Sequence, residues 1–305
     1  MIPTSADDQL VVLEEELEPS STPTVSGALE PVGRQRRRTS RIGPTIVLVA
    51  CALFFVLPMV ATARFALQNV PMVNLGWSTV FDRWTLRPIL DVLGEDQFRT
   101  TVVLSLKLAC LTVLFTQLLL LPTTLWVHLR LPKVRPLIEF LTVLPYVIPP
   151  IALVAGILVI KPSVPWFLNS DYSLIPFYAV LALPFTYRAL DAGIGALDVK
   201  TLVDASRSLG AGWGTTLARV MIPNLRSAIV ASSFLTATVV LGEYTIASVL
   251  LKETFPTFMA QYGEGHGQGG MALALLALLA TTALLALLTI LTRRRGVAAQ
   301  SATVF

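Results

Sequence analysis

Six stretches of this sequence are long and apolar enough to cross a lipid bilayer. A spanning helix needs about 20 consecutive, mostly apolar residues, and six runs of the chain meet or nearly meet that need. They lie at residues 44–66, 101–127, 136–160, 174–194, 226–251 and 271–292. Backbone polar groups in lipid must be hydrogen-bonded within their own segment, and these runs do not alternate as barrel strands do. The sequence therefore predicts an all-α membrane protein with six transmembrane helices.

The charged residues are few and unevenly placed. They make up only 14% of the 305 residues, whereas an average soluble domain carries about 25%. Seven of the 19 acidic residues fall within residues 7–30, and five arginines fall within 34–41. This composition excludes an ordinary cytosolic enzyme, a disordered protein and a nucleic-acid-binding protein. Both cysteines, Cys51 and Cys110, lie in apolar runs, so neither a disulfide framework nor a metal site is predicted.

Composition also divides the chain into tails, loops and a core. The acidic and then basic, Pro/Ser/Thr-rich beginning predicts a disordered tail. The run that follows is too long for the apolar part of a signal peptide, so we expect it to be retained. The predicted segments are a cytoplasmic tail at 1–43, a first transmembrane helix at 44–66, an outer loop at 67–100, a five-helix core at 101–292 containing an inner loop at 195–225, and a cytoplasmic tail at 293–305.

The distribution of basic residues predicts the orientation of the chain. With the N-terminus inside, the inner segments hold 16 lysines and arginines, whereas the outer segments hold six. Lys and Arg accumulate on the cytoplasmic side of membrane proteins. Both termini are therefore predicted to be cytoplasmic.

The longest inner connection, residues 195–225, is too polar to span the membrane and has a helical pattern. Four of its residues recur at three-to-four spacing and share one predicted face: Leu202, Val203, Ser206 and Leu209. Gly210 and Gly212 are expected to end or bend this helix. A second short helix is expected from Trp213 to Met221, ended by Pro223.

This inner loop carries a spaced motif. Asp204-Ala205-Ser206 is followed after three residues by Gly210, and after nine more by Val220-Met221-Ile222-Pro223. The pattern resembles the EAA loop of the permease subunits of ATP-binding-cassette importers: Glu-Ala-Ala, three residues, Gly, nine residues, Ile-x-Leu-Pro. The departures are Asp for Glu, Ser for the second Ala, and Val and Ile for Ile and Leu. The resemblance extends over residues 100–292.

The resemblance implies the MetI-like, type I importer permease fold in the inner membrane of a bacterium. Such a permease moves a small solute by alternating access. It implies three kinds of partner: two cytosolic ATPase subunits, a sister permease or second copy, and an extracytoplasmic solute-binding protein. The stretch from Leu241 to Leu251 and the polarity pattern resemble most closely the permeases of the polyamine group. Permeases for thiamine, iron(III), phosphonate and sulfate or molybdate are similar to a lesser degree. The expected ATPase-docking residues are Asp204, Ala205, Ser206, Leu209, Gly210, Trp213, Ile222 and Pro223.

The chain's own chemistry predicts no enzyme. A P-loop requires a Gly-Lys pair before Ser or Thr, and the sequence contains no Gly-Lys pair. No catalytic set is found, and no cofactor is expected on this chain; ATP and Mg would be bound by the partner ATPase. Two alternatives remain. A secondary transporter should show repeats or several intramembrane acids, and a structural membrane protein would leave the loop motif unexplained.

A translocation pathway is predicted from polar and kinked positions inside the runs. Glu243 lies about two turns below the outer end of the fifth run, and an ionisable group at that depth usually faces a cavity or a partner. Glu243 and Tyr244 are therefore pathway candidates, together with Pro145 and Pro149, which would kink the third run. The alternatives for Glu243 are a structural hydrogen bond or a pair with Lys107.

The remaining ionisable residues are expected to have structural roles. Arg188 and Asp191, three residues apart, are predicted to pair with each other. His128 and Glu139 are predicted to be interfacial. His266 lies in the glycine-rich stretch 263–270, which is predicted to be a flexible outer loop.

Overall fold

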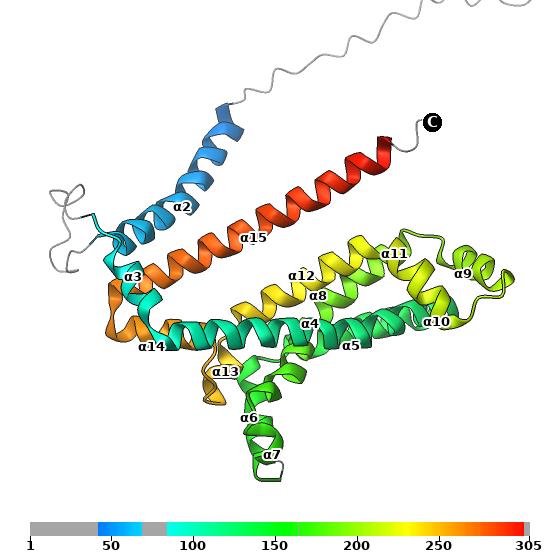
Figure 1. The fold of residues 1–305 in the computed structure, drawn as a ribbon, viewed down its shortest axis with the longest axis horizontal. Coiled ribbons are helices and arrows are strands. Elements are labelled where there is room, and N and C mark those ends of the chain that lie inside the picture. The colour runs from blue at the N-terminus through cyan, green and yellow to red at the C-terminus, as the bar shows by residue number, and fades with distance from the viewer. Residues whose placement is uncertain (1–41, 69–83, 164, 302–305) are drawn as a thin grey trace, which may run out of the picture. The chain divides into compact units, whose positions relative to one another are not determined.

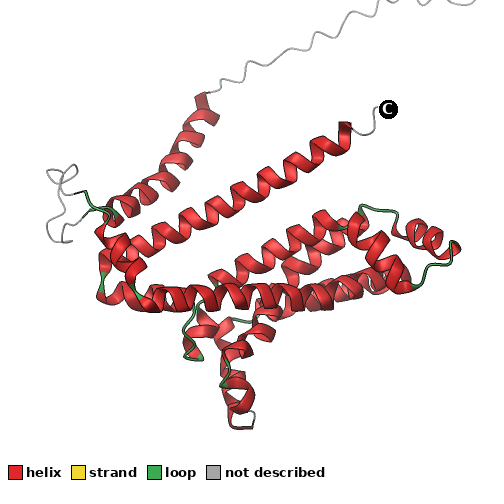
Figure 2. Ribbon diagram, viewed as in Figure 1, coloured by secondary structure: helices red, strands yellow, loops and turns green. Residues whose placement is uncertain are grey.

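The computed structural model describes residues 42–68, 84–163 and 165–301, and nearly all of them are helical (Figures 1 and 2). Within these ranges the only extended pairing is an isolated bridge between Gln68 and Trp84. By its internal contacts the chain divides into two units, residues 1–53 and 54–305. Of the first unit, the structure describes only the beginning of helix α2 (Ile42–Ala66). The predicted all-α class is confirmed.

Several of the described helices are long and apolar enough to cross a membrane. Three qualify alone: α2, α4 (Asp96–Arg130) and α8 (Leu174–Gly195). Two bent pairs raise the number to five, namely α5 (Arg135–Val147) with α6 (Pro150–Ile160), and residues 213–224 with α12 (Arg226–Gly242). A further helix, α15 (Gly267–Ser301), contains an apolar stretch from Gly267 to Ala283 and corresponds to the sixth predicted run.

Short helices connect the long ones. They are α3 (Arg87–Gly94), η3 (Pro132–Val134), η4 (Lys161–Ser163), α7 (Pro165–Leu168), η5 (Asp171–Ser173), α9 (Val199–Ser208), α10 (Trp213–Thr216), the π-helical η6 (Leu217–Met221), α11 (Ile222–Asn224), α13 (Thr245–Val249) and α14 (Phe255–Gly265). The polar loop predicted at 195–225 therefore contains four of these short elements.

The third predicted run is not one straight helix. Its two halves, α5 and α6, meet at an angle of 83°. Ile148 between them has an extended backbone, with ψ at 125°, and Pro149 follows it. A residue that precedes proline is disfavoured in the helical region by the proline ring. The two consecutive prolines, Pro149 and Pro150, thus account for the break.

Three long helices form the centre of the fold. In Figure 1, α4, α8 and α12 run side by side, and these three pack against one another. Some polar side chains within the bundle pair between helices: Gln117 Nε2 donates to Ser232 Oγ at 2.6 Å, and the hydroxyls of Thr186 and Thr236 lie 2.6 Å apart. Such hydrogen bonds between helices join α12 to both α4 and α8.

Apolar side chains complete the bundle at both ends. One buried cluster contains Leu108, Tyr178 and Val240, and a second contains Leu125, Leu190 and Met221. Members of the second cluster come from α4, α8, α9 and η6. The short helices of the 195–225 loop are therefore packed on the bundle rather than free of it.

The glycine-rich stretch 263–270 was predicted to be a flexible loop, and this prediction is wrong. It forms the end of α14 and the beginning of α15, and Tyr262 stacks on His266 with ring centroids 4.7 Å apart. The two helices approach very closely here: a Cβ atom on Gly270 would lie only 2.7 Å from the Gly263 Cα. Glycines in membrane proteins often serve such close helix contacts.

We predict that Gly270→Ala destabilises the contact between α14 and α15. The added methyl group would meet backbone atoms that cannot rotate away, and overpacking of this kind costs about 1–3 kcal/mol. Gly265→Ala is the control, since nothing lies within 4 Å of its Cβ position. Thermal unfolding of the purified protein in detergent would test this. Equal midpoints for the two variants would contradict the predicted close contact.

Candidate functional site

The first candidate site is the 195–225 loop, whose helix α9 has a well-defined beginning. Asp198 is its N-cap: one carboxylate oxygen accepts from the Thr201 amide at 3.3 Å and the other from the Thr201 hydroxyl at 2.7 Å. The hydrogen bonds from Thr201 hold the pKa of Asp198 below its usual range. The cap is therefore charged at neutral pH, and α9 begins within four residues of the end of α8.

Gly210 ends α9 in a left-handed conformation. Its φ is +82°, its amide donates to Arg207 O at 2.9 Å, and the amide of Ala211 donates to Ser206 O at 3.2 Å. This pair of bonds is the Schellman arrangement, which satisfies the last carbonyl groups of a helix and favours glycine. The glycine of the sequence motif thus turns the chain sharply between α9 and α10.

The two arms of the loop are joined by a buried hydrogen bond. Ser206 Oγ of α9 and Thr216 Oγ1 of α10 lie 2.9 Å apart, and both side chains are buried. Val203, also buried, packs in the inner apolar cluster. Ser206 therefore stabilises the loop from inside. Leu209 was predicted on the same face, but this is wrong: it is the residue that ends α9, and its side chain is 89% exposed.

Most of the predicted docking residues lie on the outside of the loop. The exposed ones are Asp204, Ala205, Leu209, Gly210, Trp213, Ile222 and Pro223. Trp213 is held in place by two contacts: the Arg207 guanidinium lies 5.1 Å from its ring centroid, and the ring of Trp126 in α4 lies 6.3 Å away. The loop thus presents apolar side chains on a braced scaffold.

The second arm of the loop differs from its prediction. Instead of one helix ended by Pro223, it consists of α10, the π-helical η6 and α11, and it continues through Pro223 to Asn224. Pro223 occupies the first turn of α11, where its missing N–H leaves no hydrogen bond unmade. The turn to α12 then follows at Leu225, with a bend of 78°.

The second candidate site surrounds Glu243, where the fifth predicted run is broken. Glu243 has an extended backbone, with ψ at 122°, and separates α12 from α13. Its buried carboxylate accepts from the amides of Ile246 at 2.8 Å and Ala247 at 3.4 Å. The side chain therefore satisfies the free amides at the beginning of α13. Of the two alternatives to a pathway role, the structure contains the hydrogen bond, and no ion pair links Glu243 to Lys107 among the described side chains.

A cavity of about 540 Å³ opens beside this break. Glu243 and Tyr244 line it, as do Tyr146, Phe185 and Thr238. The complete lining also includes Pro150, Leu181, Val239, Gly242 and Thr245. The rings of Tyr146 and Phe185 meet edge to face, with centroids 5.3 Å apart.

The predicted pathway residues are thus placed unequally. Glu243 and Tyr244 line the cavity, whereas Pro145 and Pro149 do not. The prolines instead flank Tyr146 and Pro150, which do line it. Sequence reasoning missed Tyr146 and Phe185, and the only signal for Tyr146 was its position beside a predicted kink.

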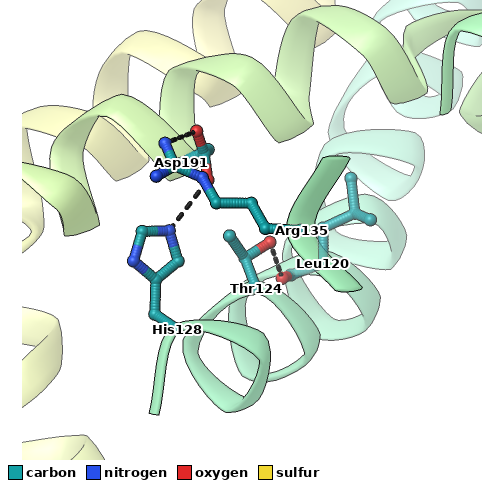
Figure 3. Close-up of polar contacts among 5 residues, drawn as sticks. All are labelled: Leu120, Thr124, His128, Arg135 and Asp191. Atoms are coloured by element: carbon teal, nitrogen blue, oxygen red, sulfur yellow. Dashed lines mark hydrogen bonds and ion pairs between the residues drawn. The ribbon is translucent and has the colours of Figure 1, made fainter. Parts of the chain in front are cut away.

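The charged residues at the opposite end of the bundle pair between helices. Arg188 and Asp191 were predicted to pair with each other, and this is wrong. Arg188 reaches Glu139 of α5 at 3.2 Å, and Asp191 binds Arg135 of α5 and His128 of α4 (Figure 3). The partners of both residues therefore come from the helices that pack against α8.

Comparison with known proteins identifies the chain. A family model described as "Binding-protein-dependent transport system inner membrane component" matches residues 121–296, more than half of the sequence. The chain belongs to this family. It is an inner-membrane, multi-pass permease subunit of an ABC importer, a kind of component that typically is not itself an ATPase and that works with ATPase and binding-protein partners.

A solved structure has the same fold. It is described as the crystal structure of a bacterial ABC transporter involved in the import of the acidic polysaccharide alginate. The TM-score is 0.64 at 13% identity, covering 95% of this permease and 99% of that chain. A search among curated proteins found no match. At this low identity the similarity establishes the MetI-type fold of the permease and not its substrate.

We predict that Gly210→Ala loosens the end of α9 in the permease. A Cβ atom at this position has open space, so the cost comes from the left-handed backbone alone, about 1 kcal/mol. Gly212→Ala is the control, because Gly212 also has open space but a φ of −73°. Hydrogen exchange of the 199–211 segment should be about fivefold faster in the first variant only. Equal protection in both variants would contradict the proposed role of the glycine.

Proposed function

We propose that this permease moves a small organic cation of the polyamine type, such as spermidine or putrescine, into the cytoplasm by alternating access. An extracytoplasmic solute-binding protein would deliver the cation. Two cytosolic ATPase subunits, each binding ATP and Mg, would supply the energy. A sister permease or second copy would complete the pathway, with both termini of this chain in the cytoplasm.

The 195–225 loop is the proposed docking element for an ATPase subunit. A partner can drive a membrane helix by rigid-body movement only through a segment that does not deform. In this loop, Asp198 caps the beginning of α9 and Gly210 ends the helix with a left-handed turn. The hydrogen bond between Ser206 and Thr216 then holds the two arms together. The exposed Leu209 and Trp213 then offer apolar anchors, and tryptophan is enriched at binding hot spots.

The cavity at Glu243 is the observation that carries the proposed substrate class. Its lining combines one carboxylate with three aromatic rings, those of Tyr146, Phe185 and Tyr244. Aromatic faces and carboxylates both attract ammonium groups. The two amides that bind Glu243 leave further lone pairs on its oxygens, since a carboxylate offers about four acceptor positions. Leu181 and Val239 provide apolar surface for the methylene groups of a polyamine.

The residues that line this cavity also distinguish between the other candidate substrates. None of the described residues around this cavity is basic, so phosphonate, sulfate and molybdate would enter a site without a positive partner. Thiamine and iron(III) are cations and remain alternative outcomes of the transport test. Because the chain belongs to a family of ABC importer permeases, the alternative of a secondary transporter is no longer needed to explain its sequence.

We predict that Leu209→Asp abolishes co-purification with the ATPase subunit. The change places a charge on the apolar anchor, whereas the fold is unaffected because the side chain is 89% exposed. Leu251→Asp is a matched control, since Leu251 is 85% exposed but lies between α13 and α14. The measurement is the ATPase recovered per permease after affinity purification. Equal recovery with both variants would refute docking at Leu209.

We predict that Glu243→Gln lowers spermidine uptake about tenfold at sub-saturating concentration, equivalent to about 1.4 kcal/mol. Glutamine keeps an oxygen that can accept from the Ile246 amide, so the helix break is preserved while the charge is lost. Glu253→Gln, an exposed acid outside the cavity, is the control. The assay is radiolabelled spermidine uptake into proteoliposomes containing the full complex. Uptake of thiamine or sulfate but not of spermidine by the unaltered complex would overturn the substrate class.

A further inference from the structure

A partly buried carboxylate joins three helices (Figure 3) at the end of the bundle that carries the 195–225 loop. Asp191, in the last turns of α8, receives a hydrogen bond from Arg135 Nε of α5 at 2.8 Å and makes a second contact with Arg135 Nη2. His128 Nε2 of α4 lies 2.8 Å from the same carboxylate. We call these three residues the Asp191 clasp.

The clasp combines two mostly buried side chains with one exposed side chain. The Asp191 and His128 side chains are each 13% exposed, whereas the Arg135 side chain is 45% exposed. The guanidinium of Arg135 binds both carboxylate oxygens, which fixes the orientation of the two helices as well as their distance. A nearby pair between Arg188 and Glu139 joins α8 to α5 again, but its side chains are 66% and 44% exposed. An exposed pair of that kind contributes little.

The clasp lies beside the docking loop. Only residues 196–198 separate α8 from α9. Val199 and Val203 of α9 are buried in the same apolar cluster as Leu190 and Ile194, which flank Asp191 on α8. A movement of α9 is therefore applied directly to the end of α8 that carries the clasp.

Two of the clasped helices lead from the clasp to the cavity. Arg135 begins α5, and Tyr146, eleven residues further along the same helix, lines the cavity at Glu243. Asp191 lies six residues after Phe185 on α8. Phe185 also lines the cavity, and its ring contacts that of Tyr146. Pro145 lies inside α5 one residue before Tyr146, and Pro184 lies inside α8 one residue before Phe185. The chain thus has a continuous helical connection from the clasp to both aromatic side chains, along α5 to Tyr146 and along α8 to Phe185.

We propose that the Asp191 clasp is the mechanical joint of the permease, making α9 and the adjoining parts of α4, α5 and α8 move as one body. Asp191 is then a positioning residue: it touches neither substrate nor ATPase but transmits the displacement of the docking loop to the cavity. This inference rests on the proposed docking role of α9. Without the clasp, α9 would still bind the ATPase, but α5 would not follow it.

The proposal is tested with Asp191→Asn in a complex whose cysteines, Cys51 and Cys110, are replaced by serine. Spin labels at Lys200→Cys on α9 and Val147→Cys at the end of α5 report the distance across the clasp, and both positions are exposed. With an intact clasp, this distance should be the same without nucleotide and with ATP plus vanadate. In Asp191→Asn it should shift or broaden by about 3 Å or more in the vanadate state, on the order of helix shifts at switching interfaces.

Two further variants separate the joint from general stability. Arg188→Gln, which removes the exposed pair between the same helices, should leave the distance unchanged. The exchange Asp191→Arg with Arg135→Asp should restore part of the fixed distance if Asp191→Asn fails to assemble. ATP hydrolysis by the assembled Asp191→Asn complex should persist while spermidine uptake per ATP falls at least about fivefold.

The results that overturn the joint differ from those that overturn the proposed function. An unchanged distance and unchanged uptake per ATP in Asp191→Asn would refute the clasp alone. Failure of the unaltered permease to bind an ATPase subunit would refute docking at α9, on which the clasp depends. Failure of spermidine uptake with a normal response of the spin-label distance to Asp191→Asn would refute the substrate class and support the joint.

Discussion

The requirement that backbone polar groups be hydrogen-bonded within the bilayer governs this structure. Continuous helices meet it by themselves, as α4 and α8 do. The chain departs from continuous helix at Ile148 and at Glu243, and each departure needs a local remedy. At the first, proline residues remove donors that would otherwise be unpaired. At the second, the Glu243 carboxylate accepts from the amides of Ile246 and Ala247. These two breaks border one cavity, which is where a membrane protein can tolerate irregular backbone.

Glu243 therefore has two compatible roles. As a cap its carboxylate satisfies the amides at the beginning of α13, and as a lining residue it places a carboxyl group at the cavity. The two roles draw on different lone pairs of the same carboxylate. A glutamine at this position would preserve the first and remove the second, which makes the charge separable from the fold. The alternatives of a structural and a pathway role, which the sequence could not separate, thus do not exclude each other.

Sequence patterns within each segment predicted the helices well, but they could not predict which residues of different helices contact each other. The apolar runs located the spanning helices because bilayer thickness fixes their length. The motif spacing located the 195–225 loop because Gly210 must adopt a left-handed backbone at a fixed distance from the start of α9. The partners of Asp191 were missed, since Arg135 and His128 are more than 50 residues away in the chain. Leu209 was misplaced because periodicity ignores where a helix ends, and 263–270 because glycine signals both flexibility and close packing.

The motif spacing itself has a physical explanation in the structure. Three residues separate Ser206 from Gly210, which is the distance that lets Ala211 return to the Ser206 carbonyl when glycine is left-handed. Ser206 also reaches Thr216 across the turn, so its hydroxyl does what a second alanine in the usual motif cannot. Apolar packing of Val203 then seats the closed loop on the bundle next to Asp191. The substitution of Ser for Ala thus exchanges a small side chain for a polar cross-link, and it stiffens the segment through which force would enter the membrane helices.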